Sequence, residues 1–322
     1  MTSIIVENSK RFGGVASDCY SCVINQARTA ASFARLNEEQ TARVVAVVEA
    51  GLERSRTAPL LVQHIVRYLA DAVIKERGKS ADFDIYAEVK EASNALSLEY
   101  AGVLQKRIDE AIQPLEAGLQ IAAAGNIIDF GAKDHASLNL KDELEIITTI
   151  PFDRYDICPF KELLARASSL LYICDNSGEI VFDMLFIREL KRSYPELEIV
   201  AAVRDKPIIN DATLEDARAV GLDQIVRTIS SGSIYPGTIL SETTEEFQNL
   251  FKSADLILSK GQGNFETLLP IADKRLFFLL RIKCEYMAAL AGVGKGSLVL
   301  MQGCPEGLTT ENGINSTLRI WD

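Results

Sequence analysis

The sequence feature that most constrains the fold is an alternation of short apolar runs and helix-like segments in the second half of the chain. The apolar runs are the predicted strands, at residues 170–174, 198–203, 224–227, 256–259, 276–280 and 297–301. Helix-compatible segments lie between most of them, at residues 179–193, 213–219, 243–253 and 284–291. Such alternation predicts a mostly parallel sheet with helices on both faces, which is a three-layer, Rossmann-like α/β domain.

The first part of the chain has helical periodicity instead. One amphipathic helix is predicted from apolar residues spaced by four positions, at Leu61, Ile65, Leu69 and Val73. A longer helix is expected after it, with an inward face formed by Val89, Ala92, Leu96, Val103 and Ile108. The sequence therefore predicts a helical bundle over residues 1–140, packed on an α/β domain over residues 141–322.

Composition limits the classes of function. The chain has 322 residues and a formal net charge of −11, which disfavours nucleic acids and anionic membranes as partners. No apolar run is as long as a bilayer span, and the first residues lack the pattern of a signal peptide, so a cytoplasmic location is expected. The six cysteines do not show the spacing of a secreted disulfide framework.

Residues 170–190 carry the clearest sign of a ligand site. An apolar strand ends in the sequence DNSGE at residues 175–179, and a helical pattern follows. In open α/β sheets ligands bind at the carboxyl ends of strands, and a helix start offers free backbone N–H groups to an anion. The same turn is also compatible with an ordinary helix cap, because Asp, Asn and Ser are common N-cap residues.

Polar residues follow the other predicted strands as well. These segments are residues 204–213, 230–232, 260–266 and 281–284. Because the ends of parallel strands meet along one edge of a sheet, we expect these residues to form a single site.

The residue types at this edge predict the chemistry. Asp175, Asn176 and Asp211 supply oxygen ligands for a divalent cation, with coordination positions left open for water and substrate. The candidate phosphate ligands are the ammonium groups and backbone N–H groups of Gly178, Lys260, Gly263 and Lys283. A metal between two acids and a phosphate favours phosphoryl transfer to water.

Four motifs together resemble the damage-control phosphatase family, long known as domain of unknown function 89. They are DNSGEIVFD at residues 175–183, INDATLEDA at 209–217, SKGQGNFE at 259–266 and RIKC at 281–284. The segment GNIIDFG at 125–131 and the pair Cys19 and Cys22, spaced as Cys-x-x-Cys, are similar to the prokaryotic branch of that family. The likeness covers nearly the whole chain, and the motifs stand in the family's order.

The resemblance implies a metal-dependent phosphatase that acts on small phosphorylated metabolites, with Mn²⁺, Mg²⁺, Co²⁺ or Ni²⁺ as cofactor. It implies metal ligation by Asp175, Asn176 and Asp211, and a catalytic role for Asp175, Asp211 and Lys283. The substrate contacts that it implies are the segment from Gln262 to Glu266, with Gly263 and Asn264, and Lys283. The residue pattern adds Gly178, Glu179 and Lys260 as candidate phosphate or substrate contacts, although Glu179 is also compatible with a first-turn acid favoured by the helix dipole and Lys260 with a surface lysine.

Two positions depart from the family pattern. The late motif here is Arg281-Ile282-Lys283, one residue shorter than the family's Arg-Thr-x-Lys and without its threonine. Glu266 stands where the eukaryotic branch has an arginine, which reverses the local charge. The identity of the substrate is therefore not carried over.

Several residues keep two interpretations. Asn126 and Asp129 either end a helix or project into the cleft from the helical domain. Cys19 and Cys22 either pack at a helix start or form an accessory metal or redox site, since their spacing is half of a zinc site and no second pair exists.

The function also has alternatives. A non-catalytic protein that binds a metal or a phosphorylated metabolite would use the same crevice. If the protein is an enzyme, the nucleophile is either water or an aspartate carboxylate. The sequence lacks the glycine patterns of a nucleotide phosphate loop and of a nicotinamide dehydrogenase, and its two histidines do not suggest a Ser-His-Asp hydrolase.

Overall fold

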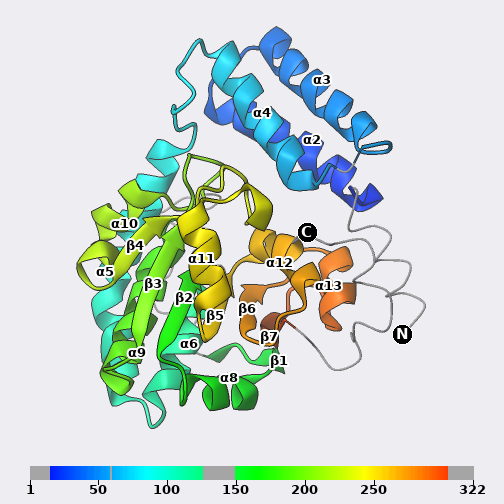
Figure 1. Cartoon of the computed structure of the whole chain (residues 1–322). Helices are drawn as coiled ribbons and strands as arrows, with labels where there is room; N and C mark the ends of the chain where they lie inside the picture. Colours follow the sequence, from blue (N-terminus) through cyan, green and yellow to red (C-terminus); the bar gives the residue numbers. More distant parts are fainter. Residues whose placement is uncertain (1–14, 59, 126–148, 304–322) are drawn as a thin grey trace.

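A single sheet organises the part of the chain that the structure describes, which is residues 15–58, 60–125 and 149–303 of this computed structural model (Figure 1). Its strands are β1 (Phe152–Tyr155), β2 (Ser169–Ile173), β3 (Glu198–Val203), β4 (Arg227–Ser230), β5 (Leu256–Lys260), β6 (Leu276–Arg281) and β7 (Leu298–Gln302). They lie in the order β1-β7-β6-β5-β2-β3-β4, and every neighbouring pair is parallel except β6 with β7. The predicted mostly parallel sheet is confirmed.

Helices cover both faces of the sheet, because both faces of its central strands are apolar. Leu170 and Tyr172 of β2 belong to one buried cluster, and Leu171 and Ile173 belong to another, as the two-residue period of a strand requires. The first face is covered by α5 (Ala87–Glu110), α6 (Pro114–Ala124), α8 (Ile157–Leu164), α9 (Glu179–Ser193) and α10 (Leu214–Val220). The second is covered by α11 (Glu245–Ser253), α12 (Gln262–Leu268) and α13 (Glu285–Ala291). This is the expected three-layer arrangement.

Three helices form a separate unit, which we call the cap: α2 (Ser17–Phe33), α3 (Glu38–Arg54) and α4 (Val62–Glu76). They pack mainly on one another around a buried cluster of their own. Figure 1 shows the cap, in blue and cyan, standing apart from the sheet beyond the ends of β2 and β3. The cluster also includes Ile208 from the segment that follows β3, so the cap rests on that segment.

The structure differs from the sequence prediction at several elements. The strand predicted at residues 224–227 is β4, which begins only at Arg227. Leu222–Gln224 form a 3-10 turn before it, with Leu222 buried. Residues 262–266, expected as a loop, are the start of α12. Strand β1 and helix α8 were not predicted.

The inward face of α5 was also predicted wrongly, apart from Ile108 and the half-buried Leu96, which packs against the core. Its buried residues are Lys90, Ser93, Asn94, Ser97, Tyr100, Leu104 and Ile108, whereas Val103 is 47% exposed. The helix buries a polar stripe because Lys90 forms ion pairs with Asp84 and Asp216. An apolar periodicity cannot detect a face of this kind.

Helices α5 and α6 pack against α9 on the sheet rather than against the cap. The predicted boundary between residues 140 and 141 lies outside the described residues and stays a prediction. Among the helices that the structure describes, none is both long and apolar enough to cross a membrane. Two further short turns are Leu240–Glu242 and Leu269–Ile271.

Candidate active site

The turn after β2 and the segment after β3 are joined by backbone hydrogen bonds. Ala212 N donates to Asp175 O at 2.8 Å, and Ser177 N donates to Asn210 O at 2.9 Å. Asn176 and Asp211 form an isolated antiparallel bridge. Two loops from neighbouring strands are thereby held in register, and the predicted metal ligands Asp175, Asn176 and Asp211 come together as buried side chains.

The two aspartates are buried, and burial makes their charged forms less stable. Burial raises the pKa of Asp175 well above its ordinary value, and the charges of Asp211 and Glu179 raise it further. Burial also raises the pKa of Asp211, although Arg204 opposes this through an Nε–Oδ2 contact of 2.7 Å. Arg204 Nη2 lies 3.7 Å from Asp175 Oδ1. One arginine thus faces both carboxylates, and a further cation would be stabilised beside them.

The amide of Asn176 is oriented by two carboxylates. Its Nδ2 donates to Asp175 Oδ2 at 2.9 Å and to Glu179 Oε1 at 2.7 Å. Since both donors of the amide are used in this way, its oxygen is the atom left to accept or to coordinate. Glu179, a predicted substrate contact, therefore holds Asn176 in this structure.

The position of the Asp175 side chain also depends on a glycine that follows the neighbouring strand β5. Gly261 follows β5 with φ +80°, and a Cβ built on it would lie 1.9 Å from Asp175 Oδ2. The side chain of Asp175 therefore occupies the space that any larger residue at position 261 would need.

A cavity of about 340 Å³ lies between the cap and this edge of the sheet. The cap lines it with Cys19, Cys22, Val23, Gln26, Val62, Gln63 and Val66. The α/β domain lines it with Asp175, Asn176, Ile209, Asn210, Asp211, Pro236, Gln262, Gly263, Glu266, Lys283, Cys284 and Tyr286. We call this space the site cavity. Its size and mixed lining are typical of a small-molecule site.

Gln262 links several groups of the site cavity. Its Oε1 accepts from Lys283 N at 2.8 Å, and its Nε2 donates to Glu266 Oε1 at 3.0 Å and to Cys284 Sγ at 3.6 Å. Lys283 is also close enough to lower the pKa of Asp175 against the raising effect of burial. The segment after β6 thus presents its lysine beside the acidic groups, as predicted.

Besides Glu179, three predicted phosphate or substrate ligands are absent from the lining of the site cavity. Gly178 N donates to Asn94 Oδ1 at 2.7 Å. Lys260 is buried behind the site, with Nζ 2.6 Å from Asp183 Oδ1 and 3.6 Å from Glu179 Oε2. Its pKa is raised, because the charges of these two acids outweigh the lowering effect of burial. Its ammonium group is thus engaged by protein carboxylates.

Asn264, the third of these residues, is a buried connector. Its Oδ1 accepts from Arg204 Nη2 at 3.0 Å and from Thr238 Oγ1 at 2.8 Å, and its Nδ2 donates to Lys260 O at 2.7 Å. Asn264 thereby fixes the guanidinium that faces Asp211. We infer that Lys260 and Asn264 position the site and do not touch the substrate.

Comparison with known proteins places these residues in a family. The family model described as the damage-control phosphatase ARMT1-like domain matches residues 15–299, which include the cap, strands β1 to β6 and the start of β7. The chain belongs to the damage-control phosphatase family. The resemblance predicted from the four motifs is thus confirmed.

Relatives in this family align with two thirds or more of this chain. A damage-control phosphatase of Pyrococcus horikoshii is 32% identical over 302 residues, covering 89% of this chain and 98% of the relative. One from Archaeoglobus fulgidus is 33% identical over 219 residues, covering 67% of this chain and 75% of the relative. A crystal structure of a DUF89 family protein from P. horikoshii superposes with a TM-score of 0.80 at 31% identity, covering 89% of this chain and 98% of the other.

The family's accessory positions are only partly described. Asn126 and Asp129 lie outside the described residues, so their predicted place in the cleft is not tested. Cys19 and Cys22 line the site cavity together with Cys284. Within the described residues, no group of three or more His, Cys, Asp or Glu side chains is arranged to hold a metal. The accessory role of Cys19 and Cys22 stays a prediction.

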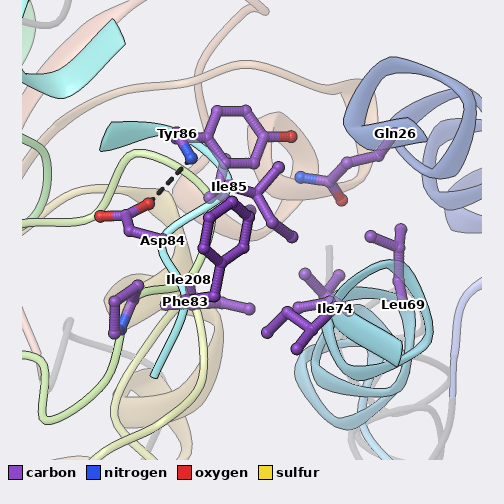
Figure 2. A pocket seen from close by; sticks show the side chains of 12 residues that line it. Gln26, Leu69, Ile74, Phe83, Asp84, Ile85, Tyr86 and Ile208 are labelled. Atoms are coloured by element: carbon purple, nitrogen blue, oxygen red, sulfur yellow. Dashed lines mark hydrogen bonds between the residues drawn. The ribbon is translucent and has the colours of Figure 1, made fainter. Parts of the chain in front are cut away.

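A second cavity, of only about 10 Å³, lies where the cap meets the body of this damage-control phosphatase. Figure 2 shows Leu69 and Ile74 of α4 facing Phe83, Ile85 and Ile208, with a dashed bond from Tyr86 N to Asp84. Apolar packing thus holds the cap against the segment that leads to Asp211, and the space is too small for a metabolite.

Several residues of the site were not predicted from the sequence. Arg204 stands among loop residues, and nothing in the sequence shows that it is 1% exposed and paired with Asp211. Gln63 comes from a distant helix, and Asn94 lies on the polar face of α5. Their only signal was a polar residue at an inward position of a helix, which an apolar pattern ignores.

Proposed function

We propose that this protein is a metal-dependent phosphatase that hydrolyses small phosphate monoesters. The observation that carries the proposal is the convergence of the buried side chains of Asp175, Asn176 and Asp211 in one cavity that Lys283 also lines. Membership of the damage-control phosphatase family supports the same reaction.

The residues present fit a divalent cation. Two carboxylates and one amide oxygen are hard ligands, and the raised pKa values of Asp175 and Asp211 reflect negative charge that a cation would stabilise. Three protein ligands leave open positions for water and for a phosphate oxygen. Mn²⁺, Mg²⁺, Co²⁺ and Ni²⁺ all accept such a set. When bound, the cation would supply Lewis-acid polarisation of the phosphate and a template for its orientation.

The chain's own residues provide the rest of the chemistry. Lys283 lies where its ammonium group can neutralise an oxygen of the phosphate as negative charge builds up. Arg204 and Glu179 keep Asp211 and Asn176 in place through hydrogen bonds of 2.7 Å each. The cap lines one side of the site cavity, and the burial of Asp175 and Asp211 there strengthens their electrostatic interactions.

The test is phosphate release from a panel of sugar, nucleotide and pantetheine phosphates, with each of the four metals or with a chelator. Wild type should release phosphate only with metal, and Asp175→Ala should not. Asp223→Ala, an exposed acid in a short turn, is the matched control and should behave as wild type. Release that is equally fast in chelator would refute metal dependence.

The same samples separate an enzyme from a binding protein. An enzyme releases phosphate in a metal-dependent way. A binder would show a metal-dependent rise in melting temperature with phosphate compounds but no release. A labelled phospho-enzyme trapped on Asp175 or Asp211 would identify a carboxylate nucleophile, and its absence during turnover would indicate water.

A further inference from the structure

Glu266 is an acidic side chain of the site cavity that the proposed chemistry does not use. It projects from α12, and its Oε2 accepts from Gln63 Nε2 of the cap at 2.7 Å. Its Oε1 accepts from Gln262 Nε2 at 3.0 Å. Two amides thus fix the carboxylate from the two sides of the site cavity. Each oxygen keeps a lone pair that another donor can use.

The strand order places Glu266 on one side of the candidate metal ligands. Asp175 follows β2 at the centre, and Asp211 follows the neighbouring β3. Glu266 lies on the helix that follows β5, and Lys283 follows β6, so both lie on the opposite side of β2 from Asp211. Gln262 joins these two residues, since it bonds both Lys283 N and Glu266.

The strand order thus separates Asp211 from Glu266 within the site cavity. The candidate metal ligands suit a phosphate group, whereas the space next to Glu266, Gln63 and Cys22 is left for the alcohol part of the ester. At about 340 Å³ the site cavity is larger than a phosphate group needs, so the alcohol part lies inside it.

We propose that Glu266 selects the substrate by its alcohol part. It favours phosphate esters whose alcohol part offers hydroxyl or amino donors, and it disfavours those that carry a second phosphate or a carboxylate there. The inference rests on the proposed phosphatase function and names its substrate class. The physical reason is that a partly desolvated carboxylate accepts hydrogen bonds strongly and repels anions strongly.

The charge of Glu266 changes near neutral pH. Burial raises its pKa to about 7, against the lowering effect of the bonds from Gln262 and Gln63. Below this value the carboxyl is neutral and repels an anion little, and above it the repulsion is complete. Discrimination against anionic alcohol parts should therefore grow as the pH rises. The other titratable groups that line the site cavity are Cys19, Cys22, Asp175, Asp211, Lys283, Cys284 and Tyr286.

The experiment compares glycerol 3-phosphate with 3-phosphoglycerate, which differ in one hydroxymethyl group replaced by a carboxylate. The ratio of their kcat/KM values is measured from pH 6 to pH 8.5. For wild type at pH 8, glycerol 3-phosphate should be preferred by about tenfold or more, and the preference should shrink towards pH 6. Glu266→Gln and Glu266→Ala should both lower this ratio. In both variants the ratio should no longer rise between pH 6 and pH 8.5.

The control is Glu196→Gln, an exposed acid in the turn before β3, which should keep the wild-type ratio. An unchanged ratio in both Glu266 variants, or a wild-type ratio that is flat with pH, would overturn this inference alone. Absence of phosphate release by wild type from either ester and from p-nitrophenyl phosphate would overturn the proposed function, and this inference with it.

Discussion

Gly261 is the residue on which the position of Asp175 depends most directly. Gly261→Ala adds a Cβ that would lie 1.9 Å from Asp175 Oδ2, so the carboxylate must move. It also places alanine at a positive φ, which costs on the order of 1–3 kcal/mol. We expect both the free energy of unfolding and the phosphatase rate to fall.

A matched control separates these two effects. Gly292, at the end of α13, has φ +70°, and a Cβ added there would have no neighbouring atom within 4 Å, so Gly292→Ala adds backbone strain alone. It should lower the unfolding free energy by about 1–2 kcal/mol, less than Gly261→Ala does, and keep the rate. Equal loss of rate in the two variants, measured by denaturant unfolding and phosphate release, would contradict the role given to Gly261.

Glu266 makes a prediction about stability that does not depend on the reaction. Its pKa is raised from the ordinary 4.5 to about 7, so the folded state binds the proton more tightly than the unfolded state. The resulting stabilisation is complete below pH 4.5 and is lost as the pH rises through 7. Glu266→Gln cannot ionise, so its melting temperature should rise relative to wild type between pH 5 and pH 8. A constant difference across this range would contradict the raised pKa.

At the scale of elements, α5 supports both loops of the site. Asn94 Oδ1 accepts from Gly178 N at 2.7 Å, and Asn94 Nδ2 donates to Asp216 Oδ1 at 3.0 Å. Asp216 Oδ2 in turn accepts from Thr213 N at 2.8 Å, two residues after Asp211. One buried amide thus connects the turn after β2 to the segment after β3.

Asn94→Ala removes this connection. It leaves a buried N–H and a buried carboxylate oxygen without their partner, which should cost about 1–3 kcal/mol of unfolding free energy. The phosphatase rate should fall as well, because the loops of Asn176 and Asp211 lose their common support. Asn249→Ala, on the exposed face of α11, is the control and should change stability by less than about 0.5 kcal/mol. A full rate in a destabilised Asn94→Ala would show that the connection is structural only.

The elements also show what the sequence can and cannot predict. The strand–helix alternation predicted the sheet, and residue types at strand ends predicted that Asp175, Asn176, Asp211 and Lys283 would meet, because parallel strands align their carboxyl ends. The short helix α12 was missed, since Gly261 at its N-cap and Gly263 within it resemble a loop. The antiparallel β7 has no local signal, because strand direction depends on the connection before it.

Buried polar contacts were the hardest part of the site to predict. Lys260 follows a strand and looked like a phosphate ligand, yet it is 1% exposed and paired with Asp183. Arg204 looked like a loop residue and instead neutralises Asp211. A charge in a sequence does not show whether its partner is a substrate or another side chain, because that depends on long-range packing.

At the scale of the whole molecule, the site lies between two units that contribute different groups. The α/β domain supplies the acids and Lys283, whereas the cap supplies Gln63 and the thiols of Cys19 and Cys22. Besides apolar packing, the cap is held by contacts such as His64 Nε2 with Glu242 Oε1 at 3.0 Å. A protein with a net charge of −11 attracts phosphate only where positive charge is concentrated, which Lys283 and the proposed metal would provide at this cavity.

The most direct test of the account is the metal-dependent phosphate release of Asp211→Asn. This change keeps the size of the side chain and removes one predicted ligand charge. We predict a fall in turnover greater than the ~10–100-fold that loss of an outer contact to a metal site costs, together with weaker metal stabilisation of the fold. Asp223→Asn should match wild type in both measurements. Full turnover and full metal affinity in a folded Asp211→Asn would contradict the assignment of the site.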